Sequence, residues 1–369
     1  MVFGFWALLL VFYIFAHEGK ESATHYLDSR NFTEPLFVFA IMVIAGTRPI
    51  LQFVAYVIAN TARMLPMRRT IALYLLVMAV IPLLGSFITE PAAMTLAALM
   101  LRENILKHAV STSFKYATLG ALFVNISVGG TLTNFAAPPV LMVAGVWQWD
   151  SAFMMSAFGW RAVMIVFINA IAVCVLFRSQ LGNIEQKPEK IDKVPLPIVL
   201  VHLAFLALVV MFSHHPAVFV GLLLFFLGFT QAYERHQDPL ILKEALLVAF
   251  FLAGLVVLGG QQAWWLKPVL LGLSPDAIFY GAAGLTAITD NAALTYLASL
   301  VNGLSPEFKV SLVGGAVAGG GLTLIANAPN PAGAAILKGQ FDVSGIRPGM
   351  LFCGAAGPTI VALCVFRWM

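Results

Sequence analysis

Residues 88–95 read ITEPAAMT and residues 288–295 read ITDNAALT, and these two octapeptides are identical at five of eight positions. Each carries one acid at the same place, Glu90 in the first and Asp290 in the second. Both acids lie inside long apolar tracts, where an ionised carboxylate costs on the order of a few kcal/mol. Their recurrence favours a functional pair, and the alternative, in which each acid only caps its own helix, stays open.

The composition around these octapeptides indicates a membrane protein. The chain has 369 residues, of which 60% are hydrophobic and 10% are charged, whereas about a quarter of a soluble protein is charged. Successive apolar segments of about 17–25 residues predict an all-α polytopic fold. The Lys and Arg residues that give the chain its net charge of +4 are expected to lie in cytoplasmic loops. Cys174, Cys353 and Cys364 have no metal-binding spacing and are interpreted as packing residues.

Four apolar tracts are too long for one crossing, namely 71–101, 116–147, 269–301 and 310–337. Two are interrupted at the acids, by GSFITEP (85–91) and TAITDN (286–291). The other two contain GGTLTNFAAPP (129–139) and GGGLTLIANAPNP (319–331). Glycine and proline break helices, and irregular backbone at membrane depth must face protein or a water-filled cavity. The pattern predicts two re-entrant hairpins and two broken transmembrane helices.

The order of these interruptions indicates an internal duplication. GGTLTNFAAPP matches GGGLTLIANAP (319–329) without gaps, and Phe-Lys recurs between the landmarks at 114–115 and 308–309. We therefore predict four regions. They are an N-terminal helix and external loop (1–35), a first repeat (36–177), a cytoplasmic linker with two connecting helices (178–239) and a second repeat (240–369).

The distribution of basic residues predicts the topology. Segments 61–70, 102–115 and 178–195 are rich in Lys and Arg, whereas the opposing segment 148–161 holds only Arg161. By the positive-inside rule the first hairpin opens to the cytoplasm. With that side fixed, counting the apolar segments along the chain gives nine full crossings and two hairpins. It also predicts a cytoplasmic N-terminus, an external C-terminus and inverted repeats. Met1–Ala16 lacks a basic start and a cleavage site, which predicts a retained helix.

Transporters built from inverted repeats bind their ions near the midplane, where the repeats meet. Hairpin arms of about 15 residues rise roughly 22 Å, so both tips can reach that level. Glu90 and Asp290 are thus predicted to ligate sodium directly from opposite sides. Neutral oxygens nearby complete the candidate ion and proton site: Thr89, Thr95, Thr133, Asn134, Thr289, Asn291, Thr295, Thr323, Asn327 and Asn330. For each threonine, a hydrogen bond to its own helix is the competing interpretation.

The chemistry expected of such a site is exchange of Na⁺ or Li⁺ for H⁺. A carboxylate that holds a proton cannot readily hold a cation as well, and two nearby acids titrate as a pair. Oxygen ligands suit a hard cation, and no His or Cys lies in the four interrupted elements. The expected partners are membrane lipid, protons and monovalent cations, with no cofactor beyond the transported ions and no enzymatic activity.

At these residues the chain resembles the ion transporter superfamily, which includes NhaD-type sodium/proton antiporters, arsenite efflux permeases and dicarboxylate transporters. TDN (289–291) resembles the acidic hairpin tip of the antiporter branch, and GGGLTLIANAPN (319–330) resembles the GGxxTxIGxxxN broken-helix pattern. The resemblance implies a homodimer in the bacterial inner membrane that moves by an elevator or rocking mechanism. By position, it implies site roles for Asp290, Asn291, Thr323 and Asn330.

The chain departs from that pattern in both halves. Ala326 stands in place of a glycine, and in the first half Pro91 and Val140 stand in place of asparagines. These departures suggest that cation ligation is weighted to the second half.

Other functions fit the same residues less well. A sodium-coupled symporter of organic anions has neutral hairpin tips, and two acids would repel its substrate; arsenite export is a further alternative. An aspartyl hydrolase would need a GxGD stretch, which neither tip contains. HEGKESATH (17–25) does not form the zinc motif HExxH. That motif needs a second histidine four residues after His17, and the residue there is Glu21.

Three polar residues near predicted helix ends have open roles. His214 and His215 form a predicted external turn, for which pH sensing is an alternative. Arg48 precedes Pro49 and either pairs with a carboxylate or marks a helix end.

Overall fold

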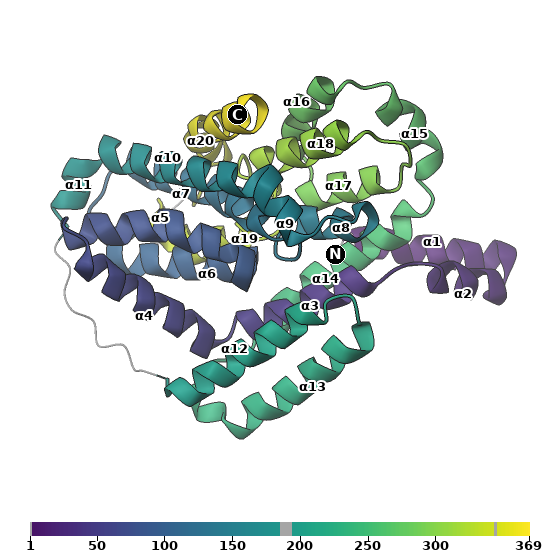
Figure 1. The fold of residues 1–369 in the computed structure, drawn as a ribbon, viewed down its shortest axis with the longest axis horizontal. Helices are drawn as coiled ribbons and strands as arrows, with labels where there is room; N and C mark the ends of the chain where they lie inside the picture. The colour runs from purple at the N-terminus through teal and green to yellow at the C-terminus, as the bar shows by residue number, and fades with distance from the viewer. Residues whose placement is uncertain (1, 185–193, 343–344) are drawn as a thin grey trace.

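The computed structural model describes residues 2–184, 194–342 and 345–369, and these residues fold into helices with no strand among them (Figure 1). The all-α prediction is therefore confirmed for this part of the chain. Short helical turns lie between the main helices: η1 (Arg102–Leu106), η2 (Gly130–Leu132), η3 (Met155–Gly159), η4 (Glu234–His236) and η5 (Lys338–Gln340).

The first half contains two interrupted helical units. Its helices are α3 (Thr33–Ala45), α4 (Arg48–Met64), α5 (Arg69–Ile88), α6 (Glu90–Leu101), α7 (Thr112–Gly129), α8 (Pro138–Trp147), α9 (Ser151–Met154) and α10 (Trp160–Leu176). The chain breaks between α5 and α6 at the acidic octapeptide, and between α7 and α8 at the glycine- and proline-rich stretch. The predicted interruptions are thus breaks in the helices.

The second half shows the same order of breaks. Its helices are α14 (Leu242–Gly259), α15 (Ala263–Leu271), α16 (Pro275–Thr286), α17 (Asn291–Ser299), α18 (Pro306–Gly319), α19 (Asn330–Leu337) and α20 (Pro348–Trp368). The α16–α17 pair is interrupted before Asp290, and α18 is separated from α19 by residues 320–329. The arms of each half also pack against the other half, α6 against α19 and α17 against α8.

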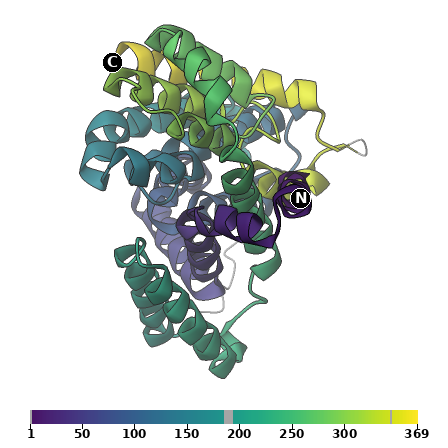
Figure 2. The ribbon, with the colours of Figure 1, turned by 90° about the vertical axis from the view of Figure 1, so that its right-hand side faces the viewer.

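The remaining helices lie at the edges of the molecule. They are α1 (Val2–Glu18), α2 (Lys20–Asp28), α11 (Arg178–Gly182), α12 (Leu196–Met211) and α13 (Pro216–Ala232). The α12–α13 pair packs against α3, and α1 packs against α14 (Figures 1 and 2). The predicted linker starts with α11, whose Leu181 is buried, so this part is not fully solvated. Lys187, Lys190 and Lys193 lie outside the described residues.

Four described helical stretches are long and apolar enough to cross a membrane: 69–88, 151–176, 242–259 and 348–368. A fifth is obtained when α3 and α4, which meet at 62°, are taken as one broken span. Four shorter apolar helices of 10–17 residues accompany them, so the count of nine crossings stays a prediction. The arm α5 has 20 residues, about 30 Å, and is longer than the predicted hairpin arm.

Glycines allow the interrupted helices to approach their neighbours closely. A Cβ on Gly120 of α7 would overlap the backbone of Gly354 in α20, and a Cβ on Gly315 of α18 would overlap the carbonyl of Phe279 in α16. Helices in membranes pack by such small residues, because lipid gives no hydrophobic drive between them. These contacts hold α7 and α18, which lead into the two broken stretches.

Candidate functional site

The first hairpin turns at Thr89, which separates α5 from α6. Thr89 has φ 75°, a left-handed conformation that costs a non-glycine residue energy. Glu90 then begins α6, with Pro91 as the next residue. Glu90 is fully buried and lies at a helix N-terminus, where the aligned peptide dipoles favour negative charge.

Glu90 is held by residues of both broken helices. Its Oε2 accepts a hydrogen bond from Asn327 Nδ2 at 2.8 Å, which links the first hairpin to the second half. On its other side lies Gly130, and a Cβ at that position would overlap Glu90 Oε1. Oε1 itself has no hydrogen-bond partner in the described part of the chain. The buried carboxylate therefore has one satisfied oxygen and one open oxygen.

The second hairpin turns between Thr286 and Asn291. Asp290 is the N-cap of α17, and its Oδ1 accepts from the backbone N–H groups of Ala292 at 2.8 Å and Ala293 at 3.2 Å. The backbone N–H of Asn291 donates to the carbonyl of Ala326 at 3.1 Å. Asp290 thus does cap its helix, as the competing interpretation holds, but the capping bonds use only one of its two oxygens.

Each broken helix is fastened to the hairpin of its own half by an equivalent threonine. Thr133 Oγ1 donates to the carbonyl of Ser86 at 2.6 Å, and Thr323 Oγ1 donates to the carbonyl of Ala287 at 2.8 Å. Thr133 and Thr323 occupy the same position in the two glycine-rich motifs. Both hydroxyls donate to the hairpin backbone, and the lone pairs of the same oxygens can still accept a hydrogen bond or bind a cation.

The break in the second half is bridged by Asn330. Its Nδ2 donates to the carbonyls of Gly320 and Thr323, both at 2.8 Å, which satisfies backbone groups that the broken helix leaves unpaired. Ser127 in α7 donates to the carbonyl of Val317 in α18 at 2.8 Å. This bond joins the two broken helices where they approach each other.

Unpaired buried oxygens gather at these breaks. Nine buried side-chain nitrogen or oxygen atoms of the described residues lack a hydrogen-bond partner, and six of them are oxygens at the two hairpin tips and the second break. They belong to Thr89, Glu90, Thr286, Asn291, Asn327 and Asn330. Each such atom costs about 1–3 kcal/mol when left unpaired. In general, hard cations are bound by carboxylates together with neutral oxygen atoms.

The two acids differ in their access to a cavity. A cavity of about 900 Å³ is lined by Thr289, Asp290 and Asn327, together with apolar side chains of α1, α14 and α17. Glu90 does not line it, although Asn327 contacts both the cavity and Glu90. Asp290 is therefore the outer acid and Glu90 the enclosed one.

The structure brings most of the predicted site residues to these two tips and breaks. Some lie elsewhere or bond locally. Asn134 donates to the carbonyl of Trp149 at 3.1 Å and accepts from Ser151, so it ties the first break to α9. The hydroxyls of Thr289 and Thr295 donate to carbonyls of their own hairpin arms. Thr95 is half-buried on α6, a turn beyond the tip.

Ser86, Ser127 and Thr286 were not among the predicted residues. Ser86 Oγ donates to the carbonyl of Gly129 and accepts from the backbone of Leu132, which closes the first break. A signal was present in the sequence, because Ser86 and Thr286 are equivalent hydroxyl residues four positions before the two acids.

Other candidates are placed away from the tips. Arg48 begins α4 and so marks a helix end, and it also pairs with Asp238 at 3.7 Å, so both interpretations are confirmed. No group of three His, Cys, Asp or Glu side chains that could hold a metal ion occurs among the described residues.

Replacing Gly130 with alanine is expected to lower the free energy of unfolding by about 1–3 kcal/mol, because the new methyl group must displace the Glu90 carboxylate. Thermal unfolding of the purified protein in detergent measures this. Gly281→Ala is the matched control, since nothing lies within 4 Å of a Cβ there. Equal unfolding temperatures for the two variants would contradict the close contact between Gly130 and Glu90.

Comparison with known proteins adds a family match. Residues 1–369 match the model of a family described as "Putative Na+/H+ antiporter". No curated protein matches the chain.

Proposed function

The chain belongs to this family of Na⁺/H⁺ antiporters over its whole length, and from that premise we propose that Glu90 and Asp290 are alternately protonated and cation-bound as it exchanges Na⁺ or Li⁺ for H⁺. Membership makes the protein a membrane transporter and not an enzyme. The observation that supports the proposed site most directly is the set of six unpaired buried oxygens at the hairpin tips and the second break.

In the proposed mechanism, Asp290 meets the ion first because it lines the large cavity. The cation then moves inward to Glu90 Oε1, where Asn327 Oδ1 and Thr89 Oγ1 are unpaired oxygens near the same carboxylate. Protonation of the carboxylates removes their negative charge and with it the attraction for the cation. Binding of either ion therefore expels the other, which is the requirement for exchange.

We also propose that the sodium ligands extend to Asn291, Thr133, Thr323 and Asn330, with Asn134, Thr95, Thr289 and Thr295 in the surrounding shell. The equivalent bonds of Thr133 and Thr323 to their hairpins support a site built twice. The side-chain oxygens of Asn291 and Asn330 support ligation weighted to the second half.

The architecture proposed with this function is that of the NhaD-like branch of the ion transporter superfamily. Residues 36–177 and 240–369 form inverted repeats, each with a re-entrant hairpin, and 1–35 and 178–239 flank and connect them. The repeated order of breaks in the two halves supports this arrangement. The proposed location is the bacterial inner membrane, as a homodimer with a cytoplasmic N-terminus and an external C-terminus. No cofactor beyond the transported ions is proposed.

Wild-type protein in sealed vesicles tests the exchange. When a pH gradient is imposed, addition of Na⁺ or Li⁺ is expected to move protons in the opposite direction, which a trapped pH-sensitive dye reports. Vesicles without protein are the control for leak. If the vesicles that contain the protein accumulate succinate in a sodium-dependent manner and show no sodium-driven proton movement, the protein is a symporter and the proposal is wrong.

A further inference from the structure

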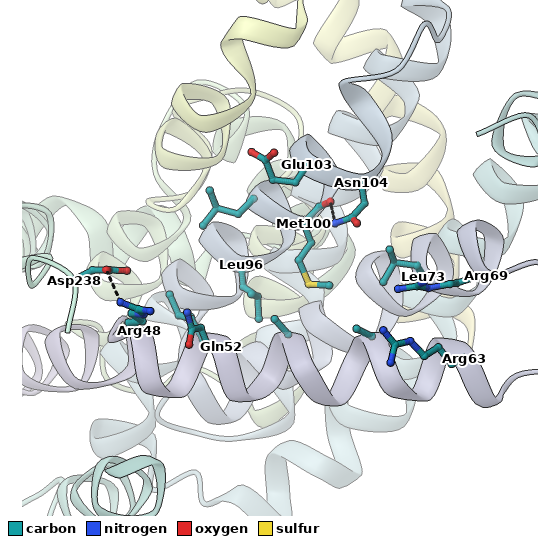
Figure 3. Close-up of a pocket in the computed structure, with 14 residues that line it drawn as sticks. Arg48, Gln52, Arg63, Arg69, Leu73, Leu96, Met100, Glu103, Asn104 and Asp238 are labelled. Carbon is teal, nitrogen blue, oxygen red and sulfur yellow. Dashed lines mark hydrogen bonds and ion pairs between the residues drawn. The ribbon is translucent and has the colours of Figure 1, made fainter. Parts of the chain in front are cut away.

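A second pocket lies along one side of α4, where α5 and α6 enclose it (Figure 3). Its volume is about 280 Å³, near the lower limit of roughly 300 Å³ for small-molecule sites. None of the predicted ion-site residues lines it. Figure 3 shows Arg63 and Arg69 at one end and the Arg48–Asp238 pair at the other, with apolar side chains between them.

We propose that this pocket binds an anionic phospholipid, with the headgroup phosphate on Arg63 and Arg69 and part of an acyl chain on the apolar floor. The proposal concerns a lipid site and stands apart from the ion exchange proposed above. It rests on three observations: unmatched positive charge, an apolar channel beside that charge, and the position of both at helix ends.

The charge balance of the pocket favours an anion. Five charged side chains line it, of which Asp238 pairs with Arg48 at 3.7 Å. Glu103 pairs at 2.7 Å with Arg102, which lies outside the lining. Arg63 and Arg69 form no ion pair with any described residue, and Arg63 has only a hydrogen bond to Asn60 at 3.3 Å. Two guanidinium groups from different helices are a geometry suited to phosphate.

The floor of the pocket suits an acyl chain. Leu73, Leu96 and Leu99 line it from α5 and α6, and their side chains offer no hydrogen bond to a polar ligand. On α4, Ala55 and Ala59 keep the space open because their side chains are small. A free phosphate would use the arginines and leave this apolar surface unused, so the lining favours a molecule with both a phosphate and a hydrocarbon part.

The arginines also stand where lipid headgroups are expected. Arg63 is in the last turn of α4 and Arg69 begins α5, so both lie at helix ends. Met64, the last residue of α4, and Met67, in the turn that follows, are 84% and 44% exposed, which suits a segment that touches the membrane. This is the face that the positive-inside rule predicts to be cytoplasmic, where anionic lipids supply negative surface charge.

Thermal unfolding in dodecylmaltoside micelles tests the proposal without measuring transport. Phosphatidylglycerol is expected to raise the unfolding temperature of the full-length protein more than phosphatidylcholine with the same acyl chains. The Arg63→Gln/Arg69→Gln variant should lose at least half of that difference. Ala59→Phe should lose it as well, because the ring fills the channel without changing a charge. The matched control, Lys107→Gln/Arg178→Gln, removes two exposed charges outside the pocket and should retain it.

Three results would overturn the proposal. The first is a full phosphatidylglycerol response in the double arginine variant or, if that variant does not fold, in Ala59→Phe. The second is an equal loss in the Lys107/Arg178 control, which would indicate general surface charge. The third is an equal rise in unfolding temperature with inorganic phosphate alone, which would identify a soluble anion as the ligand. Since none of these measurements involves ion exchange, the lipid site and the proposed function can fail independently.

Discussion

Replacing Glu90 with glutamine is expected to abolish sodium-driven proton movement in vesicles while the protein stays folded. Glutamine keeps the shape of the side chain and can still accept from Asn327, but it can neither carry a negative charge nor release a proton. Removing one partner of a buried charge interaction costs about 2–5 kcal/mol. This corresponds to a fall in sodium affinity of roughly thirtyfold or more.

The measurement compares Glu90→Gln with Glu307→Gln, in which the exposed acid lies in the first turn of α18, away from both tips. The control should exchange ions at the wild-type rate. Binding of radioactive sodium to the purified protein is measured as well, and it distinguishes a variant that binds sodium weakly from one that binds sodium but does not transport it. If Glu90→Gln exchanges ions normally, Glu90 is only a structural residue.

Replacing Asp290 with asparagine is expected to remove exchange with little loss of stability. Asparagine is as good an N-cap as aspartate, so α17 should keep its capping bonds to Ala292 and Ala293. What the variant loses is the negative charge at the cavity, and with it the attraction for an arriving cation. The expected result is an unfolding temperature close to that of the wild type, together with the loss of sodium-driven proton movement.

Asp150→Asn is the matched control for this change. Asp150 caps α9 through a bond from the backbone of Phe153 at 2.7 Å, and it is exposed. Both substitutions therefore replace a capping aspartate with a capping asparagine, and only one lies at the hairpin tip. Normal exchange by Asp290→Asn, or an equal loss in both variants, would show that the charge of Asp290 is not specifically required.

The positions of the breaks could be predicted from the sequence because their causes are local. Pro91 and Pro138 lack the N–H group that a continuing helix needs, and each lies at the first or second position of a new helix. The acid of each octapeptide likewise lies at the start of a helix, as the first residue of α6 or the cap of α17. These features depend on a few neighbouring residues, and the occurrence of the same pattern in both halves strengthened the prediction.

The partners across the site could not be predicted in the same way. Glu90 and Asn327 are 237 positions apart, and their contact depends on the rotation of α6 about its own axis. A helix that is apolar all round does not encode that rotation in its sequence. For the same reason Asn134, which aligns with no polar residue in the second half, gave no sign that it contacts α9.

Each half contributes a helix to the packing of the other half's hairpin. Because α6 packs against α19 and α17 against α8, neither half covers its own hairpin completely. A single half made alone would expose those faces and would be complete only with a second copy beside it. In their packing, the two halves thus resemble two subunits of a dimer joined in one chain. With the inverted-repeat arrangement proposed above, two separate copies of such a half would have to insert into the membrane in opposite orientations to make the same contacts.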